Sequence, residues 1–231
     1  WLPEGVGLHR LAAPAQAQPP GKPQLTAALL GAGVASYLLG AIPTSHWVAQ
    51  GIKGIDLRTV GSGNLGATNL YRQLGWRYAI PVGLFDMLKG AVPVALFGPW
   101  AGAGEIGSLL LGVVAVFGHV FSVFVGFKGG KGVATGGGIV LGFAPWAFLV
   151  ALLVWVVTTK LSGYVSLGSI LGALALPPAV WFLHPSHRAA VPYVAVLSAL
   201  VIWFHRANIG RLMAGTENRF GAGRSKHGAA A

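Results

Sequence analysis

The chain has 231 residues, of which 54% are hydrophobic and only 9% are charged, and its formal net charge is +11. Soluble domains carry roughly 25% charged residues, and several uncharged stretches here reach the ~20 residues that cross a bilayer, so the composition excludes an ordinary soluble domain and indicates an all-α polytopic membrane protein. In such a protein the excess of Lys and Arg is typical of cytoplasmic loops that face anionic headgroups, which removes the argument for a nucleic-acid partner. The absence of cysteine excludes disulfides, thiolate metal sites and cysteine nucleophiles.

The two ends of the chain differ in composition from the rest. Residues 1–23 are rich in Pro, Ala and Gln, and they lack the charged start and apolar core of a signal peptide. We expect 1–23 to be a flexible extension and 221–231 to be a flexible tail. Residues 24–220 are then expected to form a single integral-membrane domain.

Six apolar segments are visible in this domain. They cover about residues 25–49, 78–100, 106–127, 132–159, 161–183 and 189–205. Six spans would place the basic C-terminal segment opposite the basic residues of 50–77 and of the loop after 127, against the positive-inside rule.

Dividing 132–159 at Ala144–Pro145 removes this conflict, because proline disfavours helix continuation across it. The division predicts about seven transmembrane helices, with the N-terminus outside and the C-terminus in the cytoplasm. The first piece, of about 11 residues, is too short to span alone. We therefore expect a short or re-entrant half-helix sheltered by its neighbours.

The first polar segment of the chain is GSGNLGATN, from Gly61 to Asn69. Its glycines and short polar side chains could wrap an anion with successive backbone N–H groups, or could simply make a turn between helices. The candidate anion-binding residues are Ser62, Gly63, Asn64, Thr68 and Asn69, with Arg72 flanking them.

The second is GHVFSVFVGFKGGKGVATGGG, residues 118–138, which places Lys128 and Lys131 among eight glycines. It is no Walker A loop, because G-x-x-x-x-G-K-S/T requires glycine where Val125 stands and Ser or Thr where Gly132 stands. One interpretation is a phosphate site made by Lys128, Gly129, Gly130, Lys131 and Gly132. The other is a helix end anchored by two lysines, with glycines that permit tight helix packing.

The third is HRANIGRLMAGTENRF, residues 205–220. His205, Asn208 and Arg211 are three apart, so they share a face if the helix continues, and Glu217 follows. A positively charged helix exit whose side chains reach the interface is the alternative. A shorter segment, 158–169, contributes Ser166, although serines in membrane helices commonly bond a backbone carbonyl.

Ionisable residues also occur within the predicted spans. Asp86 and Lys89 are three apart, and we expect an intrahelical pair that supports the site or lies near the interface. His119 could be a buried hydrogen-bonded histidine or a catalytic one.

The residue inventory limits the possible chemistry. The five acidic residues are too scattered for a carboxylate dyad or a Mg²⁺ cage, and no histidine has an aspartate five positions on. We expect no metal and no cofactor. An enzyme with these residues would act by positioning and charge stabilisation, on a substrate that is already activated.

Together, GSGNLGATN, GHVFSVFVGFKGGKGVAT and HRANIGRLMAGTENR resemble the bacterial acyl-phosphate:glycerol-3-phosphate acyltransferase family, over about residues 25–220. The resemblance implies a seven-helix enzyme of the bacterial inner membrane with its site at the cytoplasmic face. It would transfer an acyl group from acyl phosphate to the 1-hydroxyl of sn-glycerol 3-phosphate, giving lysophosphatidic acid and phosphate, the first acylation of phospholipid synthesis. The implied partners are these substrates, the bilayer and the enzyme that produces acyl phosphate.

The resemblance also distributes roles among the candidates. Lys131, His205, Asn208 and Ser166 would be catalytic, and the substrate-binding set would be Ser62, Gly63, Asn64, Thr68, Asn69, Arg72, Lys128, Gly129, Gly130, Gly132, Arg211 and Glu217. We assign Lys131 and the 61–69 loop to the acyl phosphate, and Arg72, Ser166, His205 and Asn208 to the glycerol phosphate. A substrate phosphate oxygen would take the hydroxyl proton, with His205 as the competing base. A transporter of phosphate or phosphoesters using the same loops is the alternative function.

Overall fold

The computed structural model describes residues 27–220, in which every regular element is helical. The helices are α1 (Ala27–Ala41), α2 (Thr44–Lys53), α3 (Ala67–Leu74), α4 (Trp76–Val92), α5 (Gly98–Trp100), α6 (Gly104–Val120), α7 (Val133–Phe143), α8 (Pro145–Ser162), α9 (Val165–Leu183), α10 (Val191–Phe204) and α11 (Arg206–Met213). A π-helical turn, η1 (Pro93–Phe97), and two 3₁₀ turns, η2 (Val123–Val125) and η3 (Pro185–Ala190), connect some of them. The expected all-α class is confirmed, while the predictions for 1–23 and 221–231 concern residues outside the described part of the chain.

Six helical stretches within residues 27–220 are long and apolar enough to cross a membrane. They are Ala27–Lys53, Trp76–Trp100, Gly104–Val125, Pro145–Ser162, Val165–Leu183 and Pro185–Phe204. The expected segments are therefore found, with shifts of a few residues at their ends.

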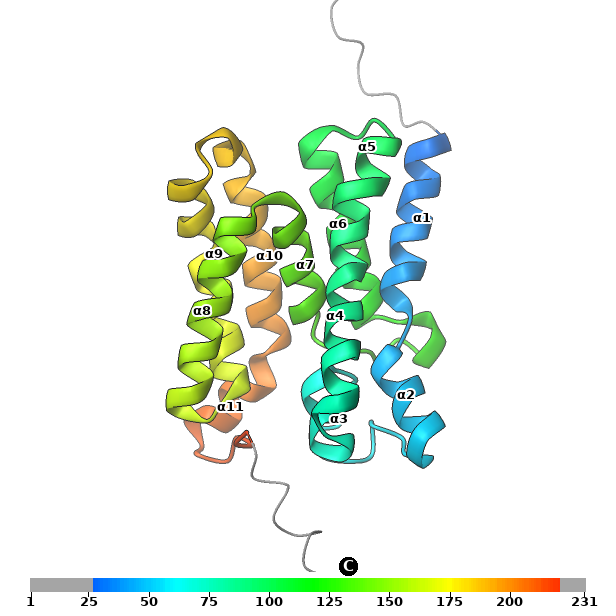
Figure 1. Cartoon of the computed structure of the whole chain (residues 1–231), viewed down its shortest axis with the longest axis vertical. Coiled ribbons are helices and arrows are strands. Elements are labelled where there is room, and N and C mark those ends of the chain that lie inside the picture. The colour runs from blue at the N-terminus through cyan, green and yellow to red at the C-terminus, as the bar shows by residue number, and fades with distance from the viewer. Residues whose placement is uncertain (1–26, 221–231) are drawn as a thin grey trace, which may run out of the picture.

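The long apolar segment 132–159 is divided where the sequence predicted. Helix α7 ends at Phe143, and Pro145 is the first residue of α8. Proline is well suited to that position, because the first N–H of a helix has no intrahelical partner. Figure 1 shows α7 beginning inside the bundle, between α6 and α10, and ending where α8 begins. The first piece is thus a separate apolar helix of 11 residues, which is shorter than a membrane span.

Glycines let the short helix α7 approach α4 backbone to backbone. A Cβ on Gly138 would overlap the carbonyl oxygen of Met87, and one on Gly90 would overlap that of Thr135. Small residues at such contacts are the usual means of close packing between membrane helices. Part of the glycine-rich stretch therefore serves packing, one of the two interpretations of the sequence.

A buried ion pair caps the break between α1 and α2. Lys89 Nζ donates to Asp86 Oδ1 at 2.5 Å and to the Ile42 carbonyl at 2.5 Å, and Ser122 Oγ donates to the Ala41 carbonyl at 2.5 Å. Pro43 interrupts the helix there, so these carbonyls would otherwise lack partners. The predicted intrahelical pair is confirmed, and it lies in the interior, since both side chains are buried.

The polar segments gather at one end of the bundle. Figure 1 shows α2, α3, the α8–α9 turn and α11 at its lower end, with the start of α1 at the other. The loop that precedes α7 lies nearer the middle of the bundle than these elements do. The three motifs are therefore placed so that their side chains can meet.

We predict that Lys89→Met strongly destabilises the fold. Removal of one partner of a buried pair costs roughly 3–5 kcal/mol, here with the Ile42 carbonyl left uncapped as well. The apparent melting temperature in detergent should fall by roughly 10 °C, whereas the matched variant of the exposed Lys160, Lys160→Met, should change it little. The double variant Asp86→Leu/Lys89→Met should recover part of the loss; an unchanged melting temperature in Lys89→Met would contradict the capping role.

Candidate active site

The carboxylate of Glu217 is the centre of the polar network. It accepts hydrogen bonds from Ser166 Oγ at 2.9 Å, Asn208 Nδ2 at 2.7 Å and Arg211 Nε at 2.7 Å. The amide oxygen of Asn208 accepts a hydrogen bond from Lys131 Nζ. Only this amide orientation satisfies both neighbours, because a carboxylate accepts and an ammonium donates. Five residues predicted from separate motifs therefore form one network.

The members of this network come from separate parts of the fold. Lys131 precedes α7, Ser166 lies in the first turn of α9, and Asn208 and Arg211 lie on α11. The three-residue spacing of Asn208 and Arg211 places both beside Glu217, as the helix prediction required. His205, in contrast, ends α10, and its Nδ1 lies 2.7 Å from the Val201 carbonyl. Its imidazole is directed back along α10 and has no hydrogen bond to the network.

Burial and neighbouring charges shift the pKa values of these groups. Burial, together with the charge of Arg211, lowers the pKa of Lys131 to about 8 against the opposing effect of Glu217. Burial would raise the pKa of Glu217, but hydrogen bonds from Asn208, Arg211 and Ser166 outweigh it, and the pKa is lowered. Glu217 is therefore an anion at neutral pH, and Lys131 is mostly, but not completely, protonated.

His205 is neutral at physiological pH. Burial lowers its pKa to about 4, against the opposing effect of its bond to the Val201 carbonyl. Because a carbonyl only accepts hydrogen bonds, Nδ1 carries the proton and Nε2 does not. His205 can thus accept a proton at Nε2, but as a weak base.

The loop 61–69 is held in shape by Asn69. This side chain is buried; its Oδ1 accepts from Ser62 N at 3.1 Å, and its Nδ2 donates to the carbonyls of Leu57 at 3.0 Å and Val60 at 3.1 Å. All the polar atoms of the side chain are engaged with the loop backbone. Asn69 braces the loop, while Ser62 and Asn64 are partly exposed.

The glycines of the 128–132 loop allow it to lie against the end of α6. Gly129 N donates to the Val120 carbonyl at 2.9 Å, and Gly130 N donates to the His119 carbonyl at 3.0 Å. A Cβ on Gly130 would overlap both the His119 ring and the Leu65 carbonyl, so the two glycine-rich loops touch here. These two N–H groups are engaged within the protein, which leaves the two lysine side chains and the first N–H groups of α7 as the loop's available donors.

A cavity of about 310 Å³ opens beside this loop. One part of its lining is polar, and the other is aromatic. The polar part and its glycines are Asn64, Lys128, Gly129, Gly130, Lys131 and Arg206; the apolar part is Val120, Phe121, Phe127, Trp203 and Phe204. Such a lining suits a molecule with an anionic head and a hydrocarbon chain.

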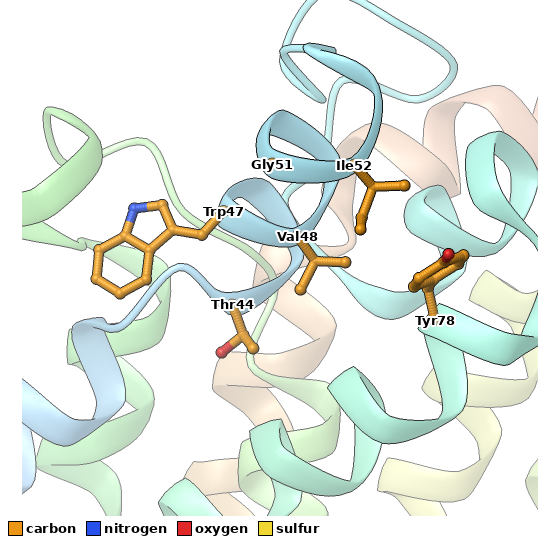
Figure 2. A pocket seen from close by; sticks show the side chains of 6 residues that line it. All are labelled: Thr44, Trp47, Val48, Gly51, Ile52 and Tyr78. Atoms are coloured by element: carbon orange, nitrogen blue, oxygen red, sulfur yellow. The ribbon is translucent and has the colours of Figure 1, made fainter.

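A second cavity, of about 510 Å³, lies between α2 and the start of α4 (Figure 2). It is lined by Thr44, Trp47, Val48, Gly51, Ile52 and Tyr78. In this view Val48 and Ile52 face Tyr78, while Trp47 projects from the other side of α2. With no charged side chain in its lining, this cavity is no candidate for phosphate.

The remaining predicted residues lie around this centre. Arg72 reaches the carbonyl of Asn218 at 3.4 Å, Thr68 is partly buried in the first turn of α3, and Gly132 precedes α7 with a φ of +74°. The sequence reasoning missed the aromatic lining of the first cavity, and it gave no role to Tyr164, a partner of Arg219. The only signal for the former was the density of Phe and Trp next to the two basic motifs.

Comparisons with known proteins match this arrangement. The family model for glycerol-3-phosphate acyltransferase matches residues 30–215. A curated glycerol-3-phosphate acyltransferase from Geobacter metallireducens is 50% identical over 187 residues, which cover 81% of this chain and 95% of that protein. One from Chlorobaculum tepidum is 41% identical over 222 residues, covering 83% and 96%. The chain belongs to the glycerol-3-phosphate acyltransferase family.

Solved structures agree with this assignment. The acyltransferase is similar to the crystal structure of PlsY, an integral membrane glycerol 3-phosphate acyltransferase, in its glycerol 3-phosphate form, with a TM-score of 0.77 at 40% identity over 84% of this chain and 96% of that one. The lysophosphatidic acid form of PlsY gives 0.75 at 39% identity, over 84% and 95%. The family expected from the three motifs is therefore confirmed, as is an integral membrane protein.

We predict that the activity of the acyltransferase falls as the pH rises through about 8. The reason is that Lys131 acts as a cation and loses its proton near that pH. The pH dependence of kcat/KM, which reports groups of the free enzyme, should show an inflection near 8. A kcat/KM that stays level up to pH 10 would exclude the protonated Lys131 as the required form.

We also predict that Asn69→Ala loses most activity without unfolding the protein. The variant removes three hydrogen bonds that shape the 61–69 loop, each worth about 1 kcal/mol. kcat/KM should fall more than about tenfold, while the loss of about 3 kcal/mol should lower the melting temperature by roughly 10 °C and leave the protein folded at the assay temperature. Gln50→Ala, at an exposed position on α2, is the control; equal activity of the two variants would show that the brace has no functional role.

Proposed function

We propose that this acyltransferase transfers a fatty acyl group from acyl phosphate to the 1-hydroxyl of sn-glycerol 3-phosphate, giving lysophosphatidic acid and inorganic phosphate. Family membership supports the acceptor and the product. The single observation that supports the donor is the cavity beside Lys131, because it combines lysines with an aromatic wall. An acyl phosphate has the same two parts, a phosphate head and an apolar chain.

The donor is assigned to this cavity. Its phosphate would lie near Lys131, Lys128 and Asn64, at the N-terminal end of α7, where free N–H groups and the helix dipole favour an anion. Its acyl chain would follow Phe121, Phe127 and the α10 aromatics toward the bilayer. As the acyl carbon–oxygen bond breaks, charge develops on the leaving phosphate, and a protonated Lys131 stabilises it.

The acceptor is assigned to the adjoining part of the network. Arg72, Ser166 and Asn208 would hold the glycerol phosphate, with Glu217 fixing the latter two through its hydrogen bonds. The bond between Lys131 and Asn208 joins the two half-sites. Binding both substrates there would bring the 1-hydroxyl to the acyl carbon, which is the main source of rate enhancement available without a nucleophile.

The hydroxyl proton is proposed to pass to a phosphate oxygen of the substrates. A phosphomonoester has a second pKa of about 6, whereas the pKa of His205 is about 4 and that of Glu217 is below its ordinary value. The phosphate is therefore a stronger base than either side chain. In the transfer, the bond from the 1-hydroxyl oxygen to the acyl carbon forms, the acyl–phosphate bond breaks, and the proton leaves with phosphate.

The orientation in the membrane is part of the proposal. The basic residues of 50–77, of the loop before α7 and of 205–220 lie toward one end of the bundle, which supports a cytoplasmic site, an external N-terminus and a sheltered half-helix α7. The location would be the bacterial inner membrane. The enzyme that forms acyl phosphate is the proposed partner, since it must supply the donor at the same face.

The test is release of phosphate by the purified protein from acyl phosphate, with acyl-CoA and acyl-carrier protein assayed in parallel. We predict release only with acyl phosphate and only when glycerol 3-phosphate is present. Lys131→Met should lower kcat at least about a hundredfold, the cost of removing a charge-stabilising donor, whereas Lys160→Met should not.

Two outcomes would contradict the proposal. Turnover of acyl-CoA at an equal rate would overturn the assignment of the donor. Counterflow of labelled glycerol phosphate in liposomes without any acyl transfer would favour the transporter alternative. The position of α3, the α8–α9 turn and α11 at one end of the bundle speaks against that alternative.

A further inference from the structure

A short segment after α11, residues 214–220, crosses the end of the bundle; we call it the strap. We propose that the strap positions Arg72 for the phosphate of the acceptor, and that the stacked rings of Phe220 and Tyr71 anchor it. The proposal rests on the assignment of glycerol 3-phosphate to this part of the site. It names Phe220 and Tyr71 as positioning residues, which act through Arg72.

Successive strap residues contact different elements. Glu217 points into the catalytic network, and the Asn218 carbonyl accepts a hydrogen bond from Arg72 Nη2 at 3.4 Å. Arg219 lies with its guanidinium 5.5 Å from the Tyr164 ring, and its Nε is 3.4 Å from the Tyr164 hydroxyl. Phe220 N donates to the Gly163 carbonyl at 2.7 Å. One extended segment therefore joins the network, α3 and the α8–α9 turn.

The ring of Phe220 completes the connection to α3. It stacks on the ring of Tyr71, with centroids 4.8 Å apart and an interplanar angle of 12°. Tyr71 immediately precedes Arg72, so the stack and the Asn218 carbonyl hold neighbouring residues of the same helix. Figure 1 shows the segment after α11 at the lower end of the bundle, between the α8–α9 turn and α3.

This support matters because α3 is too short to be stable as an isolated helix. It has eight residues, fewer than an isolated helix needs to be stable, and it is flanked by the 54–66 loop and by Gly75. Arg72 also has a long side chain that carries about 2 kcal/mol of rotamer entropy. A stacked neighbour and a carbonyl acceptor fix both the helix and the guanidinium before a phosphate arrives.

A simpler role, that of closing the helix end, would require only the Gly163 hydrogen bond. That role does not explain why Phe220 stacks on Tyr71 or why Arg72 bonds to the Asn218 carbonyl, and both of these contacts are made to α3. Burial lowers the pKa of Arg72, and the negative charge of Glu217 opposes that shift. Arg72 therefore lies close enough to interact electrostatically with the network. Residues 216–220 also lie beyond the part of the chain that the family model matches.

The experiment compares Phe220→Ala with Phe220→Tyr, using Met213→Ala as the control at a more exposed apolar residue of α11. Two quantities are measured for the full chain: the Kd of glycerol 3-phosphate by calorimetry without donor, and the KM of each substrate. We expect Phe220→Ala to raise the Kd and KM of glycerol 3-phosphate roughly threefold to tenfold, the range for a lost aromatic pair. The KM of acyl phosphate should stay within about twofold, and Phe220→Tyr should behave like the wild type.

Action through Arg72 is tested in a second background. In Arg72→Ala, the further change Phe220→Ala should add nothing to the Kd of glycerol 3-phosphate, because coupled residues are not additive. Three results would each overturn the positioning role. They are a full additional rise of the Kd of glycerol 3-phosphate in the Arg72→Ala background, an unchanged Kd in Phe220→Ala alone, and an equal loss of affinity for both substrates. Since the Kd is read without turnover, failure of the acyl-phosphate assignment would leave this test intact.

Discussion

The site depends on one buried carboxylate. The Glu217 side chain is 5% exposed and accepts hydrogen bonds from Ser166, Asn208 and Arg211. It lies among cations, since Arg72, Lys131 and Arg211 all act on its surroundings. Without it these cations would repel one another, and the buried donors of Ser166 and Asn208 would lose this acceptor. With it, an excess of positive charge remains, which is the condition a phosphate dianion can satisfy.

The two glycine-rich stretches contribute shape more than donors. Glycine allows α7 to meet α4, and it allows the 128–132 loop to lie on the end of α6. With the backbone of this loop fixed by close packing, the side chain of Lys131 is the charged part that can move. In the proposed site, recognition of phosphate would then be divided between charged side chains and a backbone scaffold that fixes the positions of those charges.

The sequence was sufficient for the larger features. Apolar lengths located the spans, and charge parity together with Pro145 divided the long segment correctly. Spacing on a helix was enough to bring Asn208 and Arg211 together. These features follow from local physics, in which length, periodicity and proline geometry act on neighbouring residues.

Individual hydrogen-bond partners were not accessible in this way. Nothing in GSGNLGATN distinguishes Asn69, which braces the loop, from Asn64, which lines the cavity. The spacing of His205 suggested a shared face with Asn208, but the end of α10 turns its ring toward Val201. The partners of Gly129 and Gly130 lie on α6. Tertiary packing decides which partner each of these groups bonds to, and the pattern of a single sequence does not reveal that packing.

If the donor binds in the first cavity as proposed, the mixed lining of that cavity has a consequence for how the lipid is handled. A chain of about 16 carbons would cost roughly 13 kcal/mol to move into water, at about 0.8 kcal/mol per CH₂. The charged edge of the cavity faces the polar loops, and its wall is formed by Phe121, Phe127, Trp203 and Phe204. The hydrocarbon chain would therefore remain among apolar groups throughout. The donor could then arrive, and the lysolipid depart, by lateral diffusion within the leaflet, and only the small water-soluble molecules would have to exchange with the aqueous phase.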